Sequence, residues 1–406
     1  MTGNAGGRYD PWAAFVDHLH CNPDLFVVGG SRSARVTATR TVIEQAIEHG
    51  HVPVVAADVR GDHRDLIASL GGTVVEPVAR TGYLDPLALG GLASITALLD
   101  GHDELQRDVA TEVATRRREL LVSMSEILRG APLTDDEATV VESALLRLDH
   151  ERTHTDHRSP GIDEVYAVIE SESPDLPRID VAPLLGAMHP LVQRGSVMAQ
   201  IFSGRFHVDP LAGTGSGAPA ALVLDLSSLG IDDPRQRSAV MLAAASAAFG
   251  ACRAAHVLAA ADVRPRRRFV IVLPEIDHLL AGGPPACRHV LRLHDTTHVI
   301  PGTRTVLSSA AATGFEPFIE RAGAVLAGGL RGGELDALDT VVPVDALDRR
   351  AITSWTQAIP TSDTTARPPD SPEFVLMGQL AGHHRLPSQH LTADLVALSQ
   401  TEAVRA

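Results

Sequence analysis

Short apolar runs alternate with helical stretches at the start of the chain. Residues 25–30, 52–58 and 73–78 are rich in valine and other apolar residues, which is typical of buried strands. Between them, residues 35–48 and 62–70 carry apolar side chains at helical spacing. This strand–helix alternation predicts parallel strands joined by right-handed crossovers.

The hydrophobic period becomes helical between residues 92 and 202. One predicted helix carries an apolar stripe, and a second starts at Asp135 and Asp136. The stripe of the first consists of Leu105, Val109, Val113, Leu120, Met124 and Leu128. We interpret this region as a mostly helical insertion, in which the polar segment 150–160 is predicted to be a loop.

Strands resume after a glycine-rich tract at 211–219, which is interpreted as a flexible connector. The predicted core strands are 221–226, 269–273, 303–308 and 322–326. Residues 360–372, rich in Pro, Ser, Thr and Asp, predict an exposed segment, and a terminal hairpin is expected from residue 374. The class is therefore α/β, with a mostly parallel sheet and a helical insertion. The expected division is 1–91 and 203–345 for the core, 92–202 for the insertion and 346–406 for the C-terminal loop and strands.

Composition limits the classes of function. The net charge of −15 argues against a general nucleic-acid binder, and Arg264–Arg268 is interpreted as a solvated edge or a subunit interface. The sequence contains no lysine, so all 35 basic residues are arginine. Three cysteines, Cys21, Cys252 and Cys287, fit neither a disulfide framework nor a zinc knuckle.

The N-terminal stretch lacks the basic-then-apolar pattern of a secretion signal, so we expect a cytoplasmic protein. The alanine-rich stretch 239–261 carries Arg253, and we interpret it as a buried helix rather than a membrane span.

The turn after the first predicted strand has the length and position of a phosphate-binding P-loop, whose pattern is G-x-x-x-x-G-K-[ST]. The candidate nucleotide-binding residues are Gly29, Gly30, Ser31, Arg32, Ser33, Ala34, Arg35, Val36 and Thr37. Three signature positions differ: Ala34 replaces glycine, Arg35 replaces lysine and Val36 replaces the hydroxyl residue. Taken alone, an ordinary glycine-rich strand–helix turn explains the segment equally well.

Each replacement has a chemical meaning. Ala34 adds a Cβ where glycine permits close approach, and the planar guanidinium of Arg35 is not a compact ammonium. Val36 has no oxygen to ligate a metal, and Thr37 is expected to point elsewhere on the helix. Backbone N–H groups at the helix start can still bind phosphate, so ATP stays a candidate ligand, whereas Mg²⁺ is not expected.

A second landmark is the strand 269–273, followed by Pro274, Glu275, Ile276 and Asp277. Walker B strands end in Asp-Glu, and Pro274 stands at the Asp position. Glu275 is the candidate catalytic residue because it can polarise a water, although an ordinary acid at a strand end is an equal alternative. Asp277, two residues after Glu275, is a displaced substitute for the missing Walker B aspartate.

The order of these segments resembles the conjugative type IV secretion ATPases, particularly actinobacterial TraC-like proteins. The resemblance extends from about residue 8 to the end, through YDPW, VVAADVRGDHRDLIASLGG, GYLDPLALG, LTDDEATVVESALLRL, GSVMAQIFSGRFHVD and ALVLDLSSLG. It implies a RecA-like P-loop NTPase core that assembles as a hexamer and energises transfer at a membrane channel.

This chain departs from the family at further positions. Where the family tends to have a polar sensor residue, it has Ala310 or Ala311, and the expected basic pair is reduced to Arg292 with Asp295. Together with the P-loop and Pro274, these losses favour a pseudo-ATPase that acts as a structural or regulatory subunit. We expect a homo-oligomer or a hetero-oligomer with an active paralogue, peripheral to a membrane secretion complex.

Two alternatives stay open. An active but divergent ATPase would use Arg35, Glu275 and a displaced metal ligand. A zinc hydrolase is suggested by the H-E-x-x-H pattern of His150, Glu151 and His154, followed by His157. This short pattern arises readily by chance among 19 histidines, so no metal site is expected.

Overall fold

The computed structural model of the chain describes residues 24–77, 84–152, 159–173, 179–202, 221–298, 302–357, 373–378 and 388–392. They form two units. The first is drawn from Met1–Gly50, Val272–Asp277 and Arg304–Ala406, and the second from His51–Ile271 and His278–Thr303. The entry segment 8–23 with Cys21, the connector 211–219 and the segment 360–372 lie outside the described residues. The division at residues 91, 202 and 345 stays a prediction.

The first unit is built on five strands in the order β6-β1-β7-β8-β9. These are β6 (Thr303–Ser309), β1 (Leu25–Val28), β7 (Ala324–Ala327), β8 (Glu373–Gly378) and β9 (Gln389–Thr392). Strands β6, β1 and β7 run parallel, with Leu25 opposite Val306 and Ala324, whereas β8 and β9 are antiparallel. All four residues of β1 are buried, which explains its continuous apolar run.

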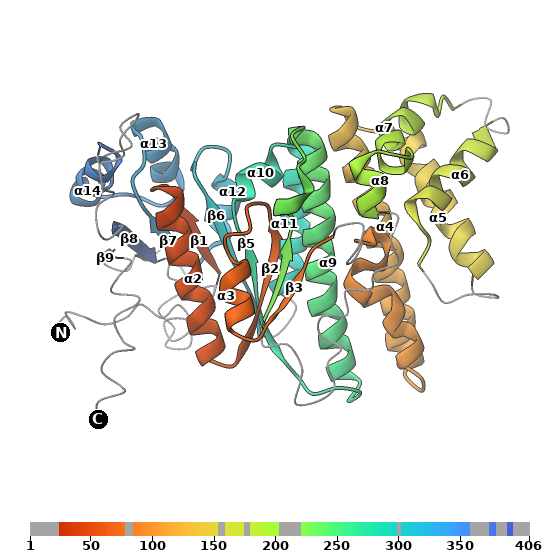
Figure 1. The fold of residues 1–406 in the computed structure, drawn as a ribbon, viewed down its shortest axis with the longest axis horizontal. Helices are drawn as coiled ribbons and strands as arrows, with labels where there is room; N and C mark the ends of the chain where they lie inside the picture. Colours follow the sequence, from red (N-terminus) through yellow and green to blue (C-terminus); the bar gives the residue numbers. More distant parts are fainter. Residues whose placement is uncertain are drawn as a thin grey trace. The chain divides into compact units, whose positions relative to one another are not determined.

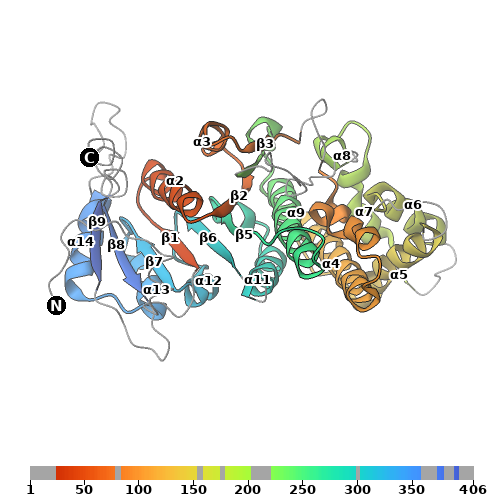
Figure 2. The same cartoon turned by 90° about the horizontal axis from the view of Figure 1, so that it is seen from below.

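Helices cover both faces of these strands. Figure 2 shows α2 (Arg32–Glu48) on one face of β1 and β7, and α12 (Glu316–Arg321) and α13 (Gly332–Val341) on the other. The helix α14 (Ala346–Gln357) contacts β8. Phe26 of β1 packs against Phe315, with ring centroids 6.1 Å apart, so the centre of β1 is held in an aromatic core.

The second unit contains three parallel strands in the order β3-β4-β2. These are β3 (Thr73–Val75), β4 (Leu222–Asp225) and β2 (His51–Asp58). A bulge interrupts β2 between Val55 and Asp58, where Ala57 has φ +62°. The strand β5 (Arg268–Leu273) and the helix α10 (Ile276–Leu280) that follows it each contain residues of both units.

Helices make up the rest of the second unit. In Figures 1 and 2, the long helix α9 lies between strands β2 to β4 and the group α4 to α8. The elements are α3 (Arg64–Ser69), η1 (Pro86–Leu98), α4 (Asp103–Arg129), α5 (Asp135–Arg152), α6 (Ile162–Glu172), α7 (Ala182–Val192), α8 (Val197–Phe202), η3 (Ser227–Leu229), α9 (Pro234–Ala260) and α11 (Pro284–His298). The predicted insertion is thus helical in its described part.

The alanine-rich stretch is buried, as predicted. By length and composition α9 is apolar enough to cross a membrane, but 89% of that stretch is buried within the protein, as in the core helix of a soluble protein. It packs closely on η1, because Gly250 faces the backbone of Leu89 and Gly90 faces that of Ala247. Small residues are needed where two backbones approach this closely.

The predicted strands are confirmed in the described chain, whereas several helix limits differ from expectation, and two of these differences have a local cause. The first is α2, which begins at Arg32 rather than at residue 35, because Ser31 caps it there. The second concerns the segment 150–160: α5 continues through Arg152. An ion pair of 2.9 Å between Arg147 and Glu151, one turn apart, contributes to extending the helix into this polar sequence.

Candidate functional site

The turn between β1 and α2 is short. Only Gly29, Gly30 and Ser31 separate the last strand residue from the first helical residue. Both glycines are left-handed, with φ +74° and +69°, and a Cβ on Gly29 would lie 2.6 Å from Leu330. The turn and the neighbouring chain therefore account for both glycines without a bound phosphate.

Several backbone N–H groups of this segment already have partners. Gly30 N–H donates to the Gly329 carbonyl at 2.8 Å and Arg35 N–H donates to the Ser31 carbonyl at 3.1 Å. Ala34 N–H donates to Ser31 Oγ at 3.1 Å. Because P-loops bind phosphate with backbone N–H groups, these internal bonds reduce the donors available to a ligand.

Arg35 folds back onto the turn that precedes its own helix. Its Nη1 donates to the Gly30 carbonyl at 3.0 Å and to the Gly29 carbonyl at 3.4 Å. Arg35 is only 7% exposed. The guanidinium thus braces the turn through main-chain carbonyls, whereas a phosphate-binding lysine would direct its charge towards a ligand.

The next two positions offer no metal ligand at the turn. Val36 is half-buried and has no side-chain oxygen. Thr37 donates its hydroxyl to the Ser33 carbonyl at 2.9 Å, one turn back along α2. Ser33 Oγ lies 2.9 Å from Ser31 Oγ at the exposed start of the helix. These hydroxyls serve local helix capping and back-bonding.

Glu275 lies on the same unit as this turn. Its Oε1 is 3.8 Å from Arg32 Nε, and its backbone is left-handed, with φ +51°. Glu275 is 8% exposed, while the Arg32 side chain is 45% exposed. The structure therefore brings the second landmark to the start of α2. Asp277 follows in α10, and its Oδ1 is buried without a hydrogen-bond partner among the described residues.

The loop after β6, where the family resemblance implies a sensor residue, is held by hydrogen bonds to its main chain. Ser309 Oγ accepts from Ala311 N–H at 3.2 Å. Glu334, at the start of α13, accepts from Ala312 N–H at 2.5 Å and from Thr313 N–H at 2.8 Å. Ala310 and Ala311 contribute no polar side chain. Glu334 orders this loop through its two hydrogen bonds, and the sequence pattern did not identify it.

Gly328 and Gly329 were also not singled out from the sequence. A Cβ on Gly328 would lie 3.0 Å from the Gly30 nitrogen, and one on Gly329 would lie 2.9 Å from the Thr356 nitrogen. The segment after β7 is therefore packed backbone to backbone against the β1–α2 turn. Its only sequence signal is the pair of glycines after a predicted strand.

The remaining candidates lie in the second unit. Arg292 Nη1 pairs with Glu119 Oε1 at 2.5 Å, so its charge is used between α11 and α4. His150 and Glu151 lie near the end of α5, while His154 and His157 are outside the described residues. Within the described chain, no group of three or more His, Cys, Asp or Glu side chains is placed to hold a metal.

Comparison with known proteins finds similarity to solved structures but no match for the sequence. Neither a protein-family model nor a curated protein matches the sequence. The structure of VirB4 of Thermoanaerobacter pseudethanolicus matches 96% of this chain and 92% of its own, with a TM-score of 0.64 and 14% identity.

The chain has the fold of VirB4. The core is therefore RecA-like, in the α/β class predicted from the sequence. The plasmid coupling protein TrwB is less similar. Its complex with the ATP analogue ADPNP gives a TM-score of 0.49 at 10% identity, covering 92% of this chain and 85% of that one. Its complex with ADP and Mg²⁺ gives 0.47 at 10% identity, covering 92% and 79%.

Proposed function

We propose that this chain is a non-hydrolysing member of the conjugation and type IV secretion ATPases, a degenerate TraC-like protein. It serves as a structural or regulatory subunit of a secretion machinery. The observation that carries the proposal is the closed β1–α2 turn, in which Arg35 donates to the Gly29 and Gly30 carbonyls. A phosphate cradle needs open backbone N–H groups and a cation directed at the ligand, whereas the Arg35 guanidinium is directed at main-chain carbonyls.

Losses at the chemical positions support the same conclusion. Phosphoryl transfer depends on a metal ion and on positive charge placed at the phosphates. Here Val36 has no side-chain oxygen, Thr37 is hydrogen-bonded within α2, and Pro274 occupies the Walker B aspartate position. The RecA-like core is kept, so the scaffold supports assembly where the chemistry is missing.

The fold of VirB4 and the order of the sequence motifs support a place in such a machinery. We infer that the chain forms a homo-oligomer, or a hetero-oligomer with an active paralogue. It would act in the cytoplasm, peripheral to a membrane complex. Any ATP would then be a bound regulator, held without Mg²⁺.

ATP turnover of the purified chain with Mg²⁺ tests the proposal. We expect no turnover above the protein-free background. ATP titrations with Mg²⁺ and with EDTA should give equal affinities, or no binding in either. Light scattering of the same sample reports the assembly. Turnover at the level of an active secretion ATPase would overturn the proposal.

The divergent-ATPase alternative makes the opposite prediction. It requires Arg35 to leave the two glycine carbonyls and to contact the nucleotide phosphates, with Glu275 orienting a water. Turnover in the wild-type chain that disappears in the Arg35→Ala variant would establish it.

A further inference from the structure

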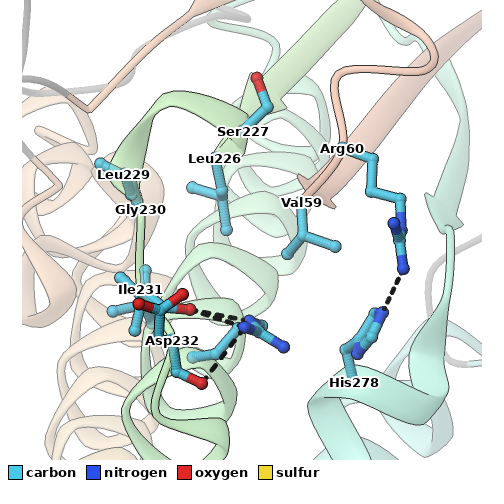
Figure 3. Close-up of a pocket in the computed structure, with 11 residues that line it drawn as sticks. Val59, Arg60, Leu226, Ser227, Leu229, Gly230, Ile231, Asp232 and His278 are labelled. Atoms are coloured by element: carbon cyan, nitrogen blue, oxygen red, sulfur yellow. Dashed lines mark hydrogen bonds between the residues drawn. The ribbon is translucent and has the colours of Figure 1, made fainter.

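A pocket of about 250 Å³ lies in the second unit, beyond the ends of β2 and β4. Figure 3 shows Val59 and Leu226, the residues that follow these strands, between Arg60 with His278 on one side and Ile231 with Asp232 on the other. In open α/β sheets, ligands bind in the crevice outside the carboxyl ends of the strands. The pocket occupies this position.

The two strand-end acids next to the pocket are used to hold the loops. Asp58 accepts from the backbone N–H of His63 at 2.8 Å and of Asp62 at 3.2 Å. Burial raises the pKa of Asp58, but its hydrogen bonds with His63 and the charge of that ring bring the net pKa below the ordinary value. Asp225 accepts from Ser227 N–H at 2.9 Å and from Arg64. Neither carboxylate lines the pocket.

Arg237 is fixed at the pocket wall by main-chain oxygens. Its Nε and Nη2 donate to the Ile231 carbonyl at 3.1 and 2.7 Å, and Nη2 lies 3.4 Å from the Asp232 carbonyl. Among the described residues Arg237 has no carboxylate partner, and its Nη1 donates to no protein atom. A rigid guanidinium with an unused edge is suited to bind an oxyanion.

An arginine and a histidine face the pocket from the other wall. Arg60 Nη2 lies 3.5 Å from His278 Nε2, and Figure 3 draws this contact across the pocket from Ile231. An oxyanion between the walls would be attracted by the Arg60 guanidinium. Among the described residues that line the pocket, Asp232 is the one acid, and two are arginines.

We propose that this pocket binds a phosphate monoester through Arg237, Arg60 and His278. Donors from two walls match the several oxygens of a tetrahedral phosphate better than the planar pair of a carboxylate. The volume exceeds that of a phosphate group alone and leaves room for a small organic part, while Val59 and Leu226 supply apolar contact. The site is independent of the β1–α2 turn and of the function proposed above.

Calorimetric titration of the full chain with inorganic phosphate, glycerol 3-phosphate and acetate tests this site. Both phosphates should bind saturably, and acetate should not. Arg237→Gln and His278→Ala should each weaken phosphate binding by about tenfold or more, because each removes a charged or polar donor. Arg235→Gln is the matched control, since Arg235 lies in the same turn of α9 and does not line the pocket.

Arg237→Gln and His278→Ala lie on opposite walls, so the test stays valid if the loop around Arg237 rearranges in one of them. Thermal unfolding checks that each variant is folded. The proposal is overturned if neither phosphate binds up to about 10 mM, if acetate binds equally well, or if both variants retain wild-type affinity. Loss of binding in Arg35→Ala with retention in Arg237→Gln would place the anion at the β1–α2 turn and also overturn it.

Discussion

Replacing Arg35 by alanine should destabilise the first unit by about 2–3 kcal/mol. Arg35 is 7% exposed and donates to one carbonyl at 3.0 Å and to a second at 3.4 Å. A hydrogen bond from a charged group contributes about 1.5–3 kcal/mol, and the longer of these two contributes less. The variant also leaves the Gly29 and Gly30 carbonyls without this donor.

The matched control is Arg32→Ala, three residues earlier in the same helix. The Arg32 side chain is 45% exposed and 3.8 Å from Glu275, so its loss should cost about 0–1 kcal/mol. Urea unfolding followed by circular dichroism measures both variants. If Arg35→Ala costs no more than Arg32→Ala, the bracing role assigned to Arg35 is wrong.

Two further changes test the packing and the electrostatics of the second unit. Gly250→Ala would place a Cβ 2.0 Å from the Leu89 carbonyl oxygen, so we expect a loss of about 3 kcal/mol, whereas Gly186→Ala in open space should gain about 0.5–1 kcal/mol. Changes of the same sign in urea unfolding would contradict this contrast. Burial, then the charges of Arg292 and Arg116, lower the pKa of His289 to about 3. The unfolded chain, with a histidine pKa of about 6.5, binds more protons between these values, so stability should fall on acidification by about 1.4 kcal/mol per pH unit. His289→Gln should remove this component of the slope measured from pH 6 to 4, and an unchanged slope would show that His289 does not stay neutral.

The predicted strands could be found because each contains a short apolar run. β1 and β4, for example, are buried along their whole length, and the sequence marks them without ambiguity. The helices between residues 92 and 202 were predictable from the helical spacing of their apolar residues. The limits of α2 and α5 were not, because Ser31 is equally compatible with a loop residue and a cap, and the polar end of α5 depends on ion pairs between side chains.

The candidate site was predictable in its position but not in its geometry. A sequence pattern identifies Arg35 as a departure from lysine, yet the direction of its guanidinium depends on the path of the Gly29–Ser31 turn. The pocket was not predicted at all. Arg60, Arg237 and His278 come from three distant segments, and only the fold brings them to one pocket.

The order β3-β4-β2 also constrains how the second unit can form during synthesis. β4 pairs with both β2 and β3, although both precede it by the whole length of the helical insertion. Closing so long a loop costs entropy before the strand pairing can compensate for it. The helices between Pro86 and Phe202 are rich in local contacts and can fold first, which shortens the effective loop. Until β4 is synthesised, the edges of β2 and β3 that pair with it stay exposed on the nascent chain. A partner or chaperone that covers these edges would therefore act before residue 222 has been made.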